Sequence, residues 1–216
     1  MMKVSKGTKI TLFVVLLLVL DQVVKILVKT NMGLGQSIHV FGDWFQILFI
    51  ENNGMAFGMQ FGGHIGKYIL SIFRIVLVIA IFWYIRKLLK IKETPTGVLL
   101  GLAAIMCGAL GNIIDSLFYG LLFSESTYTQ VAQFLPEAGG YAGFLQGKVV
   151  DMLYFPLIDT DLPGWVPFWG GRHMIFFRPI FNFADSCITC GAIYLILFHW
   201  RFFSTEFSDD RKVKTR

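Results

Sequence analysis

The sequence predicts an all-α membrane protein with four transmembrane helices, a small extracytoplasmic β-rich cradle and a long outer loop between helices three and four. Two observations favour this fold class. Hydrophobic residues make up 55% of the 216 residues, and the mean hydropathy is +0.64, which is too apolar for an ordinary soluble domain. In addition, four separate apolar segments each approach the roughly 20 residues that cross a bilayer core.

The apolar segments place the expected helices at residues 10–28, 68–85, 97–117 and 183–200. The first segment follows three lysines and resembles a secretory signal. However, Asp21 and Gln22 stand where a small-residue cleavage site would be, and the apolar pattern then resumes. We therefore interpret this segment as a retained helix, and we treat residues 1–216 as a single integral-membrane domain.

Lysine and arginine predict the orientation of the spans. Twelve of the 19 basic residues lie before the first span, between the second and third, or after the fourth. The positive-inside rule therefore predicts both termini and the 86–96 loop in the cytoplasm. Residues 29–67 and 118–182 then face outward. The first contains short apolar pieces typical of β-strands, and the second is rich in interfacial aromatics, with a short helix expected near residues 128–135.

Four aspartates lie in or beside the most apolar stretches: Asp21, Asp115, Asp151 and Asp185. An ionisable residue at the centre of a membrane helix costs about 2.5–3.5 kcal/mol, so these residues indicate a functional polar site. The predicted topology puts all four near the outer leaflet. This shared depth argues against a small proton- or cation-coupled transporter, which needs a path across the bilayer. A noncatalytic lipid-binding scaffold is a third alternative, and it would tolerate loss of the acids.

Two spans carry an asparagine followed three residues later by an aspartate. Asn112 and Asp115 continue a face of small residues on the third span, where such residues let a neighbouring helix approach. Asn182 and Asp185 open the fourth span and resemble a capping box. The N-terminus of that helix favours an ionised carboxylate at Asp185, although the acids of a coupled pair titrate as a unit and their roles could be reversed.

The first span carries Asp21 and Lys25 four residues apart. This spacing predicts an intramembrane ion pair that supports a site and takes no part in the reaction.

Other chemistries find little support in the residues. All three cysteines lie in apolar runs and the four histidines are scattered, so we expect no disulfide and no metal site. The net charge of +5 follows from topology, and we expect no nucleic-acid partner. No serine or cysteine nucleophile motif is present. Paired carboxylates remain, one activating water and the other polarising a carbonyl. The residues alone do not decide whether Asp115 or Asp151 partners Asp185.

Five blocks, in order, resemble the lipoprotein signal peptidase (signal peptidase II) family of bacterial intramembrane aspartyl peptidases. These blocks are Asp21-Gln22-Val23-Val24-Lys25, Asn52-Asn53-Gly54-Met55-Ala56-Phe57, Gly108-Ala109-Leu110-Gly111-Asn112-Ile113-Ile114-Asp115, Val149-Val150-Asp151 and Phe181-Asn182-Phe183-Ala184-Asp185. Each block alone is a weak signal, and five in sequence are highly specific.

The resemblance implies a catalytic pair at Asp151 and Asp185, with a structural role for Asp21 and Lys25. It also implies substrate-binding or supporting roles for Asn52, Gly54, Gly108, Asn112, Asp115, Asn182 and Ala184. The implied substrate is a prolipoprotein cut just before a diacylglyceryl-modified cysteine. The implied reaction needs no cofactor, and the implied inhibitor is the cyclic peptide globomycin. We expect a monomer in contact with membrane lipids, located in the bacterial cytoplasmic (inner) membrane.

Three features depart from the family pattern. Ser116 follows Asp115 where the family usually has arginine, and Met55 stands in place of a usual alanine. The loops at 118–148 and 156–178 are longer than the family usually shows, and their role is left open.

Overall fold

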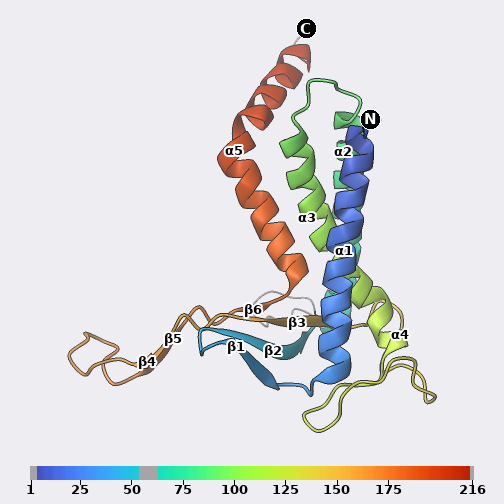
Figure 1. The fold of residues 1–216 in the computed structure, drawn as a ribbon. Helices are drawn as coiled ribbons and strands as arrows, with labels where there is room; N and C mark the ends of the chain where they lie inside the picture. The colour runs from blue at the N-terminus through green and yellow to red at the C-terminus, as the bar shows by residue number, and fades with distance from the viewer. Residues whose placement is uncertain (1–3, 54–62, 215–216) are drawn as a thin grey trace. The chain divides into compact units, whose positions relative to one another are not determined.

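Four long helices dominate the computed structural model, which describes residues 4–53 and 63–214 (Figure 1). They are α1 (Lys6–Asn31), α2 (Gly63–Leu88), α3 (Thr96–Ile114) and α5 (Phe183–Lys214). A π-helix, η2 (Asp115–Tyr119), and a short α4 (Gly120–Leu122) extend α3. The four apolar spans within these helices are Lys6–Asn31, Ile65–Leu88, Thr96–Leu122 and Phe183–Ser204. Together with the antiparallel strands described below, they confirm the predicted fold class.

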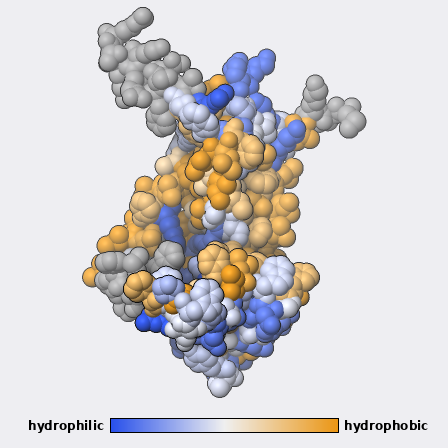
Figure 2. All heavy atoms as spheres, turned by 90° about the vertical axis from the view of Figure 1, so that its left-hand side faces the viewer, coloured by the Kyte–Doolittle hydropathy of each residue, from blue (hydrophilic) through white to orange (hydrophobic). Residues whose placement is uncertain are grey.

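The outer surfaces of these helices are apolar. Leu16, Ile69 and Ile196 each expose more than half of their side-chain area, and Figure 2 shows hydrophobic side chains over broad parts of the face it presents. Continuous apolar surface of this kind is rare on a soluble monomer. It suits hydrocarbon, where a helix satisfies its own backbone hydrogen bonds.

The chain forms two compact units. One comprises Met1–Leu20, Phe73–Gly111 and Ala184–Arg216, and the other comprises Asp21–Ile72 and Asn112–Phe183. The first, called here the helical unit, has a core of buried aliphatic side chains that includes Ile10, Leu88, Leu99 and Leu195.

Glycines allow α3 and α5 to pack closely in the helical unit. A Cβ atom at Gly108 would overlap the carbonyl oxygen of Ala184, and one at Gly101 would overlap the Leu195 side chain. The predicted face of small residues therefore serves close helix packing. Gly108 lies against the first turn of α5.

The second unit, called here the sheet unit, contains a four-stranded antiparallel sheet. Its strand order is β1 (Ser37–Phe41), β2 (Phe45–Asn52), β3 (Val149–Tyr154) and β6 (Ile180–Phe181). The β-structure expected after the first span is therefore present as β1 and β2. A core that includes Val28, Phe49, Phe123 and Met152 underlies the sheet.

The register between β2 and β3 sets the geometry around Asp151. Ile50 pairs with Asp151, Glu51 with Val150 and Asn52 with Val149. The register shifts between Ile47 and Ile50, which is the signature of a β-bulge, a feature that often re-aims side chains beside active sites.

A separate two-stranded hairpin consists of β4 (Ile158–Asp161) and β5 (His173–Phe176). It occupies part of the longer loop noted at 156–178. The two ring nitrogens of His173 lie 2.9 Å from Asp159 and 2.9 Å from Asp161, which ties the two strands together.

The expectation of a short helix near residues 128–135 is wrong. The segment is irregular, and its Phe134 forms an isolated antiparallel bridge with Phe123. The hydroxyl of Thr127 accepts hydrogen bonds from the backbone nitrogens of Thr129 and Gln130. Such local side-chain bonds offer the backbone an alternative to helix.

Candidate active site

One face of α1 carries a row of buried polar residues. Asp21, Lys25 and Lys29 follow one another at four-residue intervals, and each exposes no more than 2% of its surface. Four-residue spacing puts side chains on the same side of a helix. The C-terminal half of α1 therefore presents charged groups to the interior of the sheet unit, while Val23, Ile26 and Leu27 are exposed on its surface.

Lys25 holds three acceptors. Its Nζ lies 3.0 Å from Asp21, 2.8 Å from Asp115 and 2.9 Å from Oδ1 of Asn112. An ammonium group has three N–H donors, so these contacts satisfy all of them. A buried charge is tolerated when it is paired and hydrogen-bonded in this way.

Gln22 joins the two carboxylates from the other side. Its Nε2 donates to Asp21 at 3.0 Å and to Asp115 at 3.1 Å, and its Oε1 accepts from the Tyr119 hydroxyl at 3.2 Å. These bonds fix the orientation of the Gln22 amide. They also fix the positions of two acids that would otherwise repel each other.

Asp115 lies at the start of the π-helix. Such a widening of the helix often occurs at functional sites, and here it brings the fully buried Asp115 carboxylate to Lys25 and within 3.4 Å of the backbone nitrogen of Val150. Gly147 packs on this turn: a Cβ there would overlap the Asp115 carbonyl oxygen. The neighbouring Ser116 is buried and donates to the carbonyl oxygen of Asn112 at 3.0 Å.

Asp151 lies on β3 and is 3% exposed. Its Oδ1 accepts from Nδ2 of Asn182 at 2.7 Å, and its Oδ2 accepts from Nδ2 of Asn52. Asn182 also donates to Asn112 at 3.0 Å. The amide of Asn182 therefore connects Asp151 to the Lys25 contacts. We call the connected set the polar network: Asp21, Gln22, Lys25, Asn52, Asn112, Asp115, Tyr119, Asp151 and Asn182.

Three further predicted site residues, Gly108, Ala184 and Asp185, lie in the helical unit. Asp185 is in the first turn of α5, and Ala184 precedes it with its carbonyl oxygen against Gly108. Because Asp151 belongs to the sheet unit, the pairing of Asp151 with Asp185 stays a prediction. Gly54, like Met55, lies outside the described residues.

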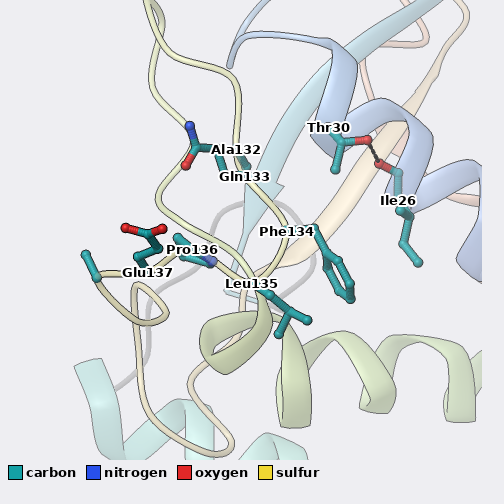
Figure 3. A pocket seen from close by; sticks show the side chains of 9 residues that line it. Ile26, Thr30, Ala132, Gln133, Phe134, Leu135, Pro136 and Glu137 are labelled. Atoms are coloured by element: carbon teal, nitrogen blue, oxygen red, sulfur yellow. Dashed lines mark hydrogen bonds between the residues drawn. The ribbon is translucent and has the colours of Figure 1, made fainter.

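A cavity of about 920 Å³ lies elsewhere in the sheet unit, between α1 and the 132–138 segment. Figure 3 shows Thr30 on its wall, donating to the carbonyl oxygen of Ile26 at 2.7 Å. The lining contains no member of the polar network. The candidate active site is therefore formed by the buried acids and amides of the polar network, and the cavity is a separate feature.

The sequence reasoning missed the part played by Lys29, Glu51 and Gln22. Lys29 forms a buried ion pair with Glu51, and a signal for it was available: Lys29 continues the spacing of Asp21 and Lys25. Gln22 gave no such signal, because its role depends on the position of Asp115 far along the chain.

Comparisons with known proteins show the family to which the chain belongs. The family model described as signal peptidase (SPase) II matches residues 13–201. A lipoprotein signal peptidase of Porphyromonas gingivalis is 50% identical over 195 residues, covering 90% of this chain and 84% of that protein. A lipoprotein signal peptidase of Amoebophilus asiaticus is 35% identical over 211 residues, covering 93% and 85%.

Solved structures support the fold. One bacterial membrane enzyme structure, determined by the in meso method at 2.3 Å resolution, superposes with a TM-score of 0.58 and 24% identity, covering 95% of each chain. Another, at 1.9 Å resolution, gives a TM-score of 0.54 and 25% identity, covering 88% of this chain and 90% of that one. With a family match across most of its length and a relative sharing half of its residues, the chain belongs to the signal peptidase II family of aspartic peptidases.

Proposed function

We propose that the chain cleaves signal peptides from diacylglyceryl-modified prolipoproteins just before the lipidated cysteine, with Asp151 and Asp185 as the catalytic acids. The observation that carries this proposal is the buried Asp151 carboxylate, held by amide donors from Asn52 and Asn182. Burying a carboxylate that is only 3% exposed costs folding free energy. Membership of an aspartic peptidase family offers a functional reason for this cost. None of the comparisons favours the transporter alternative.

Chain connectivity supports Asp185 as the partner. Asp185 follows Asn182 by three residues, so their Cα atoms can be at most about 11 Å apart. Asn182 itself donates to Asp151 at 2.7 Å. Asp115 is the weaker candidate because Lys25 and Gln22 already occupy its oxygens.

The two acids would share one proton, because two close carboxylates do not both ionise readily. The N-terminus of α5 favours an ionised Asp185, and the amide donors of Asn52 and Asn182 favour an ionised Asp151. We propose Asp151 as the ionised member because these donors bond to both of its oxygens, and the two acids titrate as a unit.

In the proposed reaction, Asp151 takes a proton from water as the water oxygen attacks the scissile carbonyl. Asp185, protonated, donates a hydrogen bond to the carbonyl oxygen as negative charge develops there. Collapse of the tetrahedral intermediate breaks the C–N bond, and a carboxyl proton passes to the leaving amine. Lys25 donates to Asn112, Asn182 donates to both Asn112 and Asp151, and these hydrogen bonds fix the position of the Asp151 carboxylate.

The remaining roles also belong to this proposal. Asp21 and Lys25 support the site, and Gly54 has a substrate-binding or supporting role. The protein is a monomer of the bacterial cytoplasmic membrane with both termini inside, the acids lie near the outer leaflet, and globomycin binds in place of the substrate.

Purified protein in detergent, given one diacylglyceryl-modified precursor, tests this function. We expect a single cut before the modified cysteine, inhibition by globomycin, and no cut of the same precursor without its lipid. Cleavage at other positions, or equal cleavage of the unmodified precursor, would refute the proposed substrate. Ion flux in proteoliposomes without any cleavage would favour the transporter.

A further inference from the structure

A second group of buried charges lies next to the polar network and takes no part in the reaction proposed above. Lys29 forms an ion pair with Oε1 of Glu51 and donates to the Ser126 hydroxyl at 2.9 Å. Ser126 donates to the same Glu51 oxygen at 2.9 Å, and Nζ of Lys148 lies 3.4 Å from Oε2 of Glu51. With Tyr141, these residues form what we call the Lys29 cluster: Lys29, Glu51, Ser126, Tyr141 and Lys148.

Tyr141 closes the cluster. Its ring lies 5.0 Å from the Lys29 ammonium and 5.4 Å from that of Lys148, within the range of cation–π attraction. Its hydroxyl accepts from the backbone nitrogen of Lys148 at 2.6 Å. Burial raises the pKa of the Tyr141 phenol above its ordinary value, so the hydroxyl stays neutral.

The cluster joins parts of the chain that are distant in sequence. Lys29 comes from the outer end of α1 and Glu51 from β2, whereas Ser126 and Tyr141 come from the long 123–148 loop and Lys148 immediately precedes β3. A buried charge held by this many partners has one low-energy arrangement. The extended loop is therefore fastened to the sheet at the point where β2 and β3 pair.

That point is one residue from the proposed catalytic acid. Successive residues of a strand face opposite sides of a sheet, and directly paired residues share a side. Glu51 pairs with Val150, which faces the buried core, whereas Asn52 and Asp151 share the other side. Holding Glu51 on one side of the sheet therefore fixes the direction in which Asn52 points on the other.

We propose that Lys29 and Glu51 are positioning residues for peptide cleavage: with Ser126 and Lys148 they fasten the 123–148 loop to β2 and so aim the Asn52 amide at Asp151. This inference rests on the proposed function and assigns a role to the long loop. The hydrogen bonds and ion pairs described for the cluster do not include Asp151. The cluster acts through Asn52, and that dependence separates positioning from general support of the fold.

A double-mutant cycle tests whether Glu51 affects cleavage through Asn52. We would measure kcat and KM on the lipidated precursor for the wild type, Glu51→Gln, Asn52→Ala and the combined variant. Glu51→Gln keeps the side-chain shape and removes the charge. We expect it to lower kcat about tenfold, because small misplacements in an active site are costly, while KM changes less than about twofold. In the Asn52→Ala background, the same change should alter kcat by less than about twofold.

Glu125→Gln is the matched control. Glu125 lies 3.5 Å from the same Lys148 ammonium, but its side chain is 65% exposed. The chemical change and the Lys148 partner are the same, whereas Glu51 is buried and also pairs with Lys29. We expect kcat within about twofold of wild type, since exposed ion pairs contribute little.

A Lys29→Met/Glu51→Gln variant covers the case in which Glu51→Gln alone fails to fold. It removes both buried charges while nearly preserving volume, so it should insert and unfold as the wild type does and yet keep the loss in kcat. Full recovery of kcat in this variant would overturn the proposal, because the cluster would then act only through folding. Independent effects would also overturn it: that is, if the fold-losses in kcat from Glu51→Gln and Asn52→Ala multiply in the combined variant.

Failure of the proposed function gives a different result. A wild-type protein that does not cut the precursor refutes that function, and this inference is refuted with it.

Discussion

Asn182 donates to Asp151 at 2.7 Å while the same amide nitrogen donates to Asn112 at 3.0 Å. Asn112 accepts a further hydrogen bond from Lys25. A single side-chain amide thus connects the acid on β3 to the charges on α1. The orientation of Asp151 therefore depends on residues from four segments of the chain, and each of these links can be removed separately.

Asn182→Ala should lower kcat about tenfold to a hundredfold, because Asp151 loses one of its two amide donors. The free energy of unfolding should fall by about 1.5–3 kcal/mol, the usual contribution of a hydrogen bond to a charged group. Steady-state cleavage of the lipidated precursor and denaturation in detergent measure the two effects. Unchanged kcat with lowered stability would show that Asn182 serves folding alone.

Lys25→Met should destabilise the protein strongly, because it leaves the buried carboxylates of Asp21 and Asp115 without their cation. Removing one partner of a buried ion pair costs about 3–5 kcal/mol. Thermal unfolding in detergent measures the loss. Adding Asp21→Asn and Asp115→Asn should recover most of the stability, since no charge then remains unpaired. A triple variant no more stable than Lys25→Met would contradict this electrostatic explanation.

Gly108→Ala should displace the first turn of α5 within the helical unit. The new methyl group would meet the Ala184 carbonyl oxygen, and Asp185 is the next residue. We expect kcat to fall about tenfold or more. Gly164→Ala is the control, because a Cβ there meets nothing within 4 Å. Equal activity of the two variants would show that close packing at Gly108 does not position Asp185.

Residues 86–96 and the β4–β5 hairpin should lie on opposite sides of the membrane. In a background lacking native cysteines, Phe168→Cys should react with an impermeant thiol reagent added outside intact cells, because Phe168 is 94% exposed. Lys90→Cys should react only after the membrane is opened. The reverse pattern would overturn the orientation derived from lysine and arginine.

The sequence was informative wherever a pattern is local. Apolar length predicts the four helices, and the spacing of Asp21 and Lys25 places both on one face of α1. Glycine spacing predicts that a neighbouring helix approaches α3 closely, and the structure shows that at Gly108 this neighbour is α5. These features depend on helical periodicity and side-chain size, and both can be read along the chain.

Features that depend on pairing between distant segments were not predictable in this way. The register shift in β2 between Ile47 and Ile50 and the contacts of Lys29 depend on how β2, β3 and the 123–148 loop meet. The π-helix at Asp115 has no local signal in the sequence. The helix predicted near residues 128–135 is wrong for a partly local reason: hydrogen bonds to the Thr127 hydroxyl from Thr129 and Gln130, together with a bridge between Phe134 and Phe123, hold the segment in an irregular form.

The cleavage rates of Asp151→Asn, Asp185→Asn and the double variant test the central claim most directly. Residues that act as one unit give non-additive losses. We predict that each single variant inserts normally and loses at least about a thousandfold in kcat on the lipidated precursor, and that the double variant loses no more than either single one. Substantial cleavage by either single variant, or losses that multiply in the double variant, would contradict a shared-proton pair at Asp151 and Asp185.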